Sequence, residues 1–177
     1  MIVGMKMTTS LEKAFCDQIT LEFQASMVYR QLAIEMELQA LPGMAAWLRH
    51  QADEEIVHAN KFIDHLADRD NHPVIGAVPA PDAKVETPLD AFKAALAHEE
   101  TVSESIRDLY RNAEADGDLD SRPLLNWFLT EQVEEEATVR DIVDRIELIN
   151  DDGPGLLRLD AELGARPTRT TENTSEQ

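Results

Sequence analysis

The sequence has little cysteine, glycine and proline: one cysteine, seven glycines and eight prolines in 177 residues. Because Cys16 has no second cysteine, it forms no internal disulfide, and without a CxxC pattern it is expected to be a small buried apolar residue. The scarcity of glycine and proline argues against many short strands, and 29% charged residues suit amphipathic helices. At this length we therefore expect one all-α domain.

Basic residues are also scarce: 16 Lys and Arg face 35 Asp and Glu, which gives a net charge of −19. Such a surface repels phosphate backbones, so nucleic acid is not an expected partner. The acidity is compatible both with plain solubility and with attraction of cations. No stretch approaches the ~20 apolar residues of a membrane span. The opening MIVGMKM is too short for a signal-peptide core, so we expect a protein of the reducing cytoplasm.

Four long runs of helical periodicity predict a four-helix bundle. The runs cover residues 9–40, 44–70, 87–115 and 121–149. Thr9 and Glu12 resemble a capping box at the first start, and Thr87-Pro88-x-Asp90 places a cap at the third. Short breaks predict antiparallel hairpins within each pair of helices. Residues 71–86, with three prolines and one glycine, are instead long enough to cross the bundle from end to end.

The C-terminal part is predicted to hold a short helix and a tail. Residues 150–155 end the fourth long run, and residues 156–163 carry three leucines on one face. Residues 166–177 are polar and rich in Thr, without an apolar face, so we expect them to be disordered. The predicted organisation is one domain over residues 1–164 followed by a tail over residues 165–177.

The apolar stripe of each long run is interrupted by polar residues near its middle. These residues are Glu22 and Tyr29 in the first run, Glu55 and His58 in the second, Glu99 in the third, and Gln132 and Glu135 in the fourth. The midpoints of the helices share one level in an up-and-down bundle, so these side chains are expected to converge in the core. A single mid-helix Glu often faces water and a single His is commonly a satisfied core residue. Interruptions at one depth on four helices favour a common site instead.

Buried carboxylates at one level need compensation, because each is costly to bury and they repel one another. No Lys or Arg lies on the interrupted stripes. Bound divalent cations are the remaining compensation, and oxygen ligands with one imidazole favour iron, manganese or zinc.

At these positions the sequence resembles the ferritins, over about residues 9–163. The similar segments are LEFQASMVY, DEEIVHAN, AHEETV and LTEQVEEE, which begin at residues 21, 53, 97 and 129. The ferritin-like di-metal arrangement takes Glu from two helices and Glu-x-x-His from two others. This chain departs from it with Gln132-x-x-Glu135, as non-haem ferritins do, and it has Ile56 where bacterioferritins place a haem-ligating Met. The resemblance therefore implies a non-haem ferritin, and haem is not expected.

The resemblance also implies a ferroxidase centre that serves an iron store. Glu22 and His58 would be terminal ligands, Glu55 would bridge two irons, and Glu99 and Gln132 would complete the second iron position. Oxygen or hydrogen peroxide would oxidise Fe(II) there. The ferric oxide product would be stored inside a hollow homo-oligomeric shell of 24 subunits.

Further family positions admit two interpretations each. Glu54, Glu131 and Glu135 match a third iron site of similar bacterial ferritins, or else they belong to a solvated acidic face. Glu135 is preferred to Glu134 because it lies on the inward stripe. Tyr29 matches a family tyrosine that donates an electron, or it packs in the core with its hydroxyl bonded to a carboxylate.

Trp127 resembles a family tryptophan near the centre, although a packing aromatic is the simpler interpretation. Family shells admit iron through pores lined by acidic residues at the start of the fourth helix, but Arg122 and Leu125 stand at the matching positions here. The nearby acidic substitutes are Asp116, Asp118 and Asp120.

The short fifth segment resembles the helix that closes a pore between ferritin subunits. Its leucine face, Leu156, Leu159 and Leu163, needs burial because a helix this short is marginal alone. Folding back onto its own bundle is the alternative.

Three other functions share some of these features. A subunit that buffers metal without turnover would need the same acidic cluster, but the complete ligand set favours turnover. A DNA-protecting mini-ferritin places its metal site between subunits, which the ligands inside this bundle and the net charge of −19 both oppose. Other di-iron carboxylate enzymes share the ligand logic, but the fifth helix and Gln132 favour storage over oxidation of an organic substrate.

Overall fold

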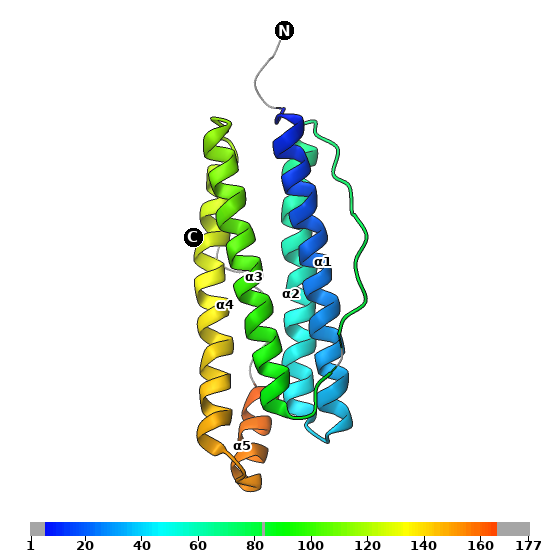
Figure 1. The fold of residues 1–177 in the computed structure, drawn as a ribbon, viewed down its shortest axis with the longest axis vertical. Helices are drawn as coiled ribbons and strands as arrows, with labels where there is room; N and C mark the ends of the chain where they lie inside the picture. Colours follow the sequence, from blue (N-terminus) through cyan, green and yellow to red (C-terminus); the bar gives the residue numbers. More distant parts are fainter. Residues whose placement is uncertain (1–5, 83, 166–177) are drawn as a thin grey trace.

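The computed structural model describes residues 6–82 and 84–165, and these residues form five α-helices and no strand. The helices are α1 (Thr9–Leu38), α2 (Pro42–Asp68), α3 (Pro88–Ala115), α4 (Arg122–Ile149) and α5 (Gly153–Gly164). Four long helices lie side by side and the short α5 lies at one end of the bundle (Figure 1). The predicted all-α bundle with a short fifth helix is therefore confirmed. Within the described residues, no helix combines the length and the apolar character that crossing a bilayer requires.

The chain forms two antiparallel hairpins, α1 with α2 and α3 with α4, joined by a long crossover. The segment between α2 and α3 runs along the outside of α1 from one end of the bundle to the other, so α2 and α3 are parallel (Figure 1). It is attached to α1 by the amide of Gly76, which donates to Thr20 Oγ1 at 2.8 Å, and by Asn71, which donates to Glu12. Cys16 packs beneath this segment and is half-buried. The predicted crossover is confirmed.

The predicted capping box at the start of α1 is wrong by one residue. Thr8 is the N-cap, and its Oγ1 accepts a hydrogen bond from the amide of Leu11 at 3.2 Å. The third helical position is then Leu11, which has no carboxylate, and Glu12 is free to accept from Asn71. The box at the start of α3 forms as predicted, with Asp90 Oδ2 accepting from the amide of Thr87 at 2.9 Å.

Two other helix starts lie earlier than predicted, each for a reason of local chemistry. Pro42 was expected in the break between the first two helices, but it is the first residue of α2. Its missing N–H and fixed φ suit the first helical position. Likewise α5 begins at Gly153. Asp152 caps it by accepting from the amide of Gly155 at 3.0 Å.

The fifth helix packs against the first turns of α2 in its own subunit. Leu159 and Leu163 are each 2% exposed, and Asp160 Oδ1 accepts from the backbone amide of Met44 at 2.8 Å. Gly43 permits this approach, because a Cβ there would lie 1.8 Å from the backbone oxygen of Asp160. Two alternatives were considered for the leucine face. In the single chain the helix folds back onto its own bundle, which is the second of them. The expected tail lies, from residue 166 onward, outside the described residues.

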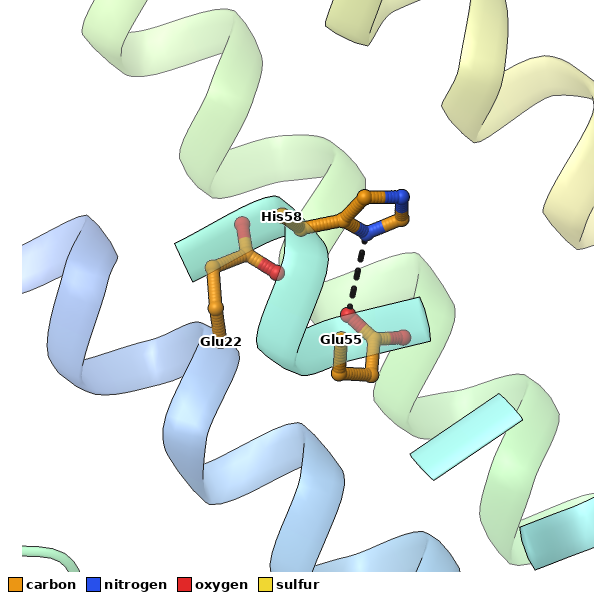
Figure 2. A group of neighbouring side chains, drawn as sticks. All are labelled: Glu22, Glu55 and His58. Atoms are coloured by element: carbon orange, nitrogen blue, oxygen red, sulfur yellow. Dashed lines mark hydrogen bonds and ion pairs between the residues drawn. The ribbon is translucent and has the colours of Figure 1, made fainter. Parts of the chain in front are cut away.

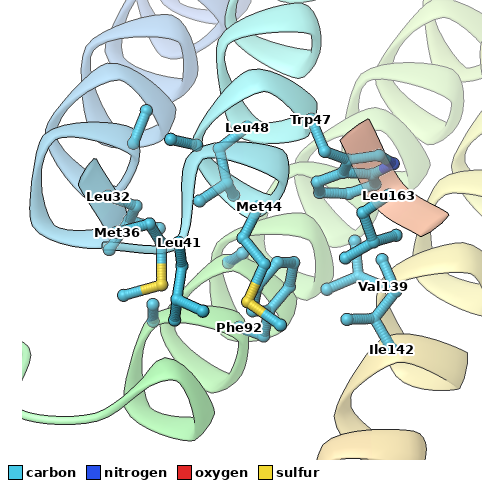
Figure 3. Packing of buried hydrophobic residues seen from close by; sticks show 14 of the residues in the cluster. Leu32, Met36, Leu41, Met44, Trp47, Leu48, Phe92, Val139, Ile142 and Leu163 are labelled. Atoms are coloured by element: carbon cyan, nitrogen blue, oxygen red, sulfur yellow. The ribbon is translucent and has the colours of Figure 1, made fainter. Parts of the chain in front are cut away.

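The apolar core consists of two clusters, one in each half of the bundle. One cluster joins the end of α1, the start of α2 and α3, the end of α4, and α5, where Met44, Trp47 and Phe92 pack together (Figure 3). The other joins the opposite halves of the four long helices and includes Phe15, Phe62 and Phe128. The polar residues at the middle of each helix lie between the clusters, so the fold holds a buried polar layer.

Candidate metal centre

Glu22 of α1 and Glu55 and His58 of α2 form the middle of the polar layer. They are 0%, 2% and 1% exposed, and each offers a ligand atom within 4.8 Å of the others' ligand atoms. The three side chains point toward one another, with the imidazole of His58 above the carboxylate of Glu55 (Figure 2). Sequence periodicity predicted that these residues would meet, and the structure brings them together.

The spacing inside this group fits a shared cation. His58 Nδ1 and Glu55 Oε2 lie 3.2 Å apart. Two ligands about 2.0–2.2 Å from one ion, at octahedral or tetrahedral angles, are separated by about 2.9–3.5 Å. In the described residues Glu22 Oε2 is buried without a hydrogen-bond partner, which is costly for a carboxylate oxygen unless a cation binds it.

The aromatic wall of the centre holds the imidazole of His58. The rings of Trp127 and Phe128 contact it edge-on, with centroids 5.7 and 5.5 Å away. Trp127 also carries Lys61 Nζ over its face, 4.8 Å from the centroid. These contacts agree with the simpler interpretation of Trp127, which is that it packs beside the site.

Glu99 of α3 and Gln132 of α4 lie next to this group and contact each other. Gln132 Nε2 donates to Glu99 Oε2 at 3.1 Å and lies 3.3 Å from Ser103 Oγ. The hydroxyl of Tyr29 also donates to Glu99. Glu99 and Gln132 are 0% and 3% exposed, so all four long helices contribute to one buried site.

Burial dominates the electrostatics of the site. It raises the pKa of Glu22 and of Glu55 well above the ordinary value, and a neighbouring carboxylate raises each further: Glu55 acts on Glu22, and Glu99 on Glu55. Burial also raises the pKa of Glu99, although the hydrogen bonds from Tyr29 and Gln132 oppose it. In the part of the chain that the structure describes, no Lys or Arg forms an ion pair with these carboxylates. Bound cations would supply the positive charge that these buried carboxylates lack.

A second acidic group adjoins the centre between α2 and α4. Glu54, Glu131 and Glu135 are 7%, 9% and 9% exposed, whereas Glu134 is exposed. Burial raises the pKa of all three, and for Glu135 the carboxylates of Glu99, Glu54 and Glu131 raise the pKa further. The burial supports the preference for Glu135 over Glu134. Glu134 therefore lies on the solvated face.

Sequence periodicity placed Gln51 on the buried stripe of the second run without giving it a role, and it missed Gln18 and Ser103, which also hold polar groups of the site. Gln18 Nε2 donates to Glu22 Oε1 at 2.7 Å, and Gln51 Nε2 donates to Glu135 Oε2 at 3.0 Å. Ser103 contacts Gln132, as described above. Each of the three is a polar residue one helical turn from a candidate ligand on its own helix. This spacing is the sequence signal that would have identified Gln18 and Ser103.

Of the three acidic residues suggested as an entry route for iron, one forms structural hydrogen bonds and two are exposed. Asp118 Oδ2 accepts from Arg69 Nη1 at 2.7 Å and from Ser121 Oγ at 2.5 Å. Asp116 and Asp120 are exposed. At the two family pore positions, Arg122 pairs with Glu114 at 3.1 Å and Leu125 is fully buried.

Comparison with known proteins identifies the family and the relatives of this chain. Residues 12–149 match the family of ferritin-like domains. The chain is 31% identical over 153 residues to a bacterial non-heme ferritin of Escherichia coli O6:H1, covering 86% of this chain and 93% of that protein. It is 34% identical over 160 residues to a bacterial non-heme ferritin of Staphylococcus haemolyticus, covering 90% and 96%. Among solved structures, an open-pore ferritin of Archaeoglobus fulgidus superposes with a TM-score of 0.90 at 33% identity, covering 93% of this chain and 100% of that chain.

Proposed function

The chain belongs to the ferritin family, and on that premise we propose that each subunit oxidises Fe(II) at a di-iron centre and delivers the ferric product to an iron store. One observation carries the proposal: a buried group of two carboxylates and one imidazole whose ligand atoms lie within 4.8 Å of one another. Such a group is costly without bound cations. Fe(II) is both substrate and cargo here.

The candidate ligands divide into two iron positions that share Glu55. Glu22 and His58 serve the first position, and Glu99 and Gln132 serve the second. Two Fe(II) ions supply two electrons, and with two protons these reduce oxygen to hydrogen peroxide, or hydrogen peroxide to two waters. The protein fixes the spacing of the ions and excludes bulk water, because every one of these side chains is at most 3% exposed.

Glu54, Glu131 and Glu135 fit a third iron position on the α2–α4 side of the centre. Their low exposure, at most 9%, and the raised pKa of Glu135 beside Glu99 support a further set of oxygen ligands next to the centre. An electron from Tyr29 would assist reduction of the oxidant, and its hydrogen bond to Glu99 supports that role as well as a purely structural one.

Storage requires a closed shell, which we propose the chain forms with 23 further copies of itself. Met27, Ile34 and Leu38 are exposed on one face of α1, at 38%, 49% and 77%. They follow helical spacing and form an apolar stripe that a neighbouring subunit would cover.

The test is aerobic Fe(II) oxidation by the metal-free protein, compared with a Glu55→Ala, His58→Ala variant. Glu100→Ala is the matched control, because Glu100 adjoins Glu99 on α3 but is exposed. Size-exclusion chromatography checks that each protein assembles. In the wild type and the control we expect rapid oxidation and retention of many irons per subunit. In the double variant we expect Fe(II) to be oxidised only at the rate measured in buffer without protein. Equal rates in all three would refute the ferroxidase and leave a metal-binding scaffold.

A further inference from the structure

Lys61 of α2 differs from the other basic residues of the helices, because within the described residues it forms neither an ion pair nor a hydrogen bond with a carboxylate. Every other lysine or arginine inside the five helices lies within 3.7 Å of a carboxylate oxygen. In a chain with 35 acidic residues and 16 basic ones, a helical cation without a carboxylate partner needs another explanation.

The ammonium of Lys61 lies instead over the ring of Trp127 in α4, with Nζ 4.8 Å from the ring centroid. That ring in turn contacts the imidazole of His58 edge-on, and the two centroids are 5.7 Å apart. Lys61 follows His58 by three residues, so both side chains lie on the same side of α2. A cation, an indole and a candidate iron ligand are therefore in successive contact between α2 and α4.

This arrangement affects how easily Trp127 loses an electron. Indole is, with phenol and thiol, among the protein groups that are oxidised most readily, and this one packs against a ligand of the centre. An ammonium is attracted by the negative face of an aromatic ring at separations up to about 6 Å. The attraction becomes repulsion when the ring gives up an electron, because the ring then carries a positive charge. The position of Lys61 therefore opposes oxidation of Trp127.

We propose that Lys61 is a positioning residue of the centre, which holds the ring of Trp127 beside His58 and protects the indole from one-electron oxidation. The inference rests on the proposed function for the source of the oxidant, which is hydrogen peroxide. The protection itself is a property of the metal-free protein, because it depends only on the contact between the ammonium and the ring.

The protected step is the one that follows when a subunit holds a single Fe(II). Reduction of hydrogen peroxide to two waters takes two electrons and two protons, and one Fe(II) supplies only one electron. Trp127 would supply the second electron together with its Nε1 proton, and solvent would supply the other proton. The products are Fe(III), two waters and a neutral indolyl radical. Lys61 makes the loss of this second electron from Trp127 less favourable.

Oxidation of the metal-free protein by chlorine dioxide tests the protection without iron. This oxidant takes one electron from an indole and yields chlorite, an indolyl radical and a proton. Because it is uncharged, its encounter with the protein does not depend on the net charge of a variant. Mass spectrometry of peptides follows the loss of intact Trp127, and Trp47, which is 6% exposed, is the internal reference. Circular dichroism checks that each variant keeps the helix content of the wild type.

Three variants separate the charge of Lys61 from its bulk. Lys61→Met keeps the length of the side chain and removes the charge, Lys61→Arg keeps the charge, and Lys93→Met removes a lysine that pairs with Glu147 at 2.7 Å. We expect Trp127 to be oxidised about threefold faster or more in Lys61→Met, and at the wild-type rate in the other two. Equal rates in Lys61→Met and the wild type, or a rate in Lys61→Arg as high as in Lys61→Met, would overturn the proposal.

Repeated additions of one Fe(II) per subunit with hydrogen peroxide test the protection during turnover. Oxidised Trp127 should accumulate in Lys61→Met faster than in the wild type, and equal accumulation would count against the proposal. The proposed function has its own measurement, which is the rate of Fe(II) oxidation by the wild type. If that rate is no higher than in buffer, the ferroxidase fails, and the comparison with chlorine dioxide still decides whether Lys61 protects Trp127.

Discussion

The hydroxyl of Tyr29 in α1 donates a hydrogen bond to the carboxylate of Glu99 in α3, inside the buried polar layer. Among the interactions that lower the pKa of Glu99 this one is the largest, although burial outweighs it. The contact therefore joins the two hairpins and also restrains a candidate iron ligand. A phenol bonded in this way has a structural role whether or not it donates an electron.

Replacing Tyr29 with Phe should lower the free energy of unfolding of the metal-free protein by about 2 kcal/mol, because a buried carboxylate loses a donor. Urea denaturation near neutral pH measures the change. Tyr110→Phe is the control, since Tyr110 is partly buried and its hydroxyl has no hydrogen bond among the described residues. Similar losses in both variants would contradict a specific contribution from the Tyr29 hydroxyl.

The raised pKa of Glu22 sets the direction of a pH effect on the metal-free protein. Burial, and then Glu55, raise the pKa of Glu22 in the folded state above the ordinary value of 4.5. Its stabilising contribution is therefore fully present below pH 4.5 and is lost as pH rises toward the folded-state pKa. Glu22→Gln imitates the neutral acid, so its free energy of unfolding should increase relative to wild type as pH rises from 4.5 toward neutrality.

Thermal unfolding of metal-free samples across this pH range measures the difference, with the exposed Glu100→Gln as control. Saturating Zn(II) should reverse the order, since the ion stabilises the wild type and finds fewer ligands in the variant. A difference between Glu22→Gln and wild type that stays constant with pH would show that the carboxylate does not become harder to ionise on folding.

Asp118 should matter for stability and not for iron uptake. Burial alone would raise its pKa, but the hydrogen bonds from Arg69 and Ser121 lower it overall. Its contribution is thus present above the ordinary pKa of 3.8 and is lost as pH falls through the folded-state value. Asp118→Asn should lower the free energy of unfolding by about 2 kcal/mol at neutral pH.

Denaturation and the initial rate of Fe(II) oxidation, measured together, separate the two roles of Asp118. The exposed Asp120→Asn is the control, which should change stability little. Slower oxidation by Asp118→Asn with unchanged stability would place Asp118 on the uptake route instead.

Sequence periodicity predicted the four long helices because their apolar stripes are long, and it predicted the convergence of Glu22, Glu55 and His58 because all three lie at mid-helix. It misplaced helix ends such as Thr8 and Pro42, where a single hydrogen bond or a missing N–H decides the start. It also missed Gln18 and Ser103, because it followed the apolar stripes and did not examine the polar residues one helical turn from each candidate ligand.

The packing of α5 could not be predicted either, because a leucine face serves equally against its own bundle or against a partner subunit. The deciding feature is a close backbone contact. A Cβ at Gly43 would lie 1.8 Å from the backbone oxygen of Asp160 and 2.7 Å from its carbonyl carbon, and neither atom can move without the helix. Gly164 lies against Gly43 in the same way, since its own Cβ would be 2.8 Å from Gly43 Cα.

Gly43→Ala should therefore displace α5 from α2, with a loss of stability of about 3 kcal/mol from overpacking. The hydrogen bond from the amide of Met44 to Asp160 would break. Hydrogen exchange of residues 153–164 should become faster, while exchange in α3 stays unchanged. Gly153→Ala is the matched control, because a Cβ there meets nothing within 4 Å. If instead α5 leaves its own bundle when the shell assembles, Gly43→Ala should leave exchange in the assembled protein unaltered, and the contact seen here would belong to the free subunit alone.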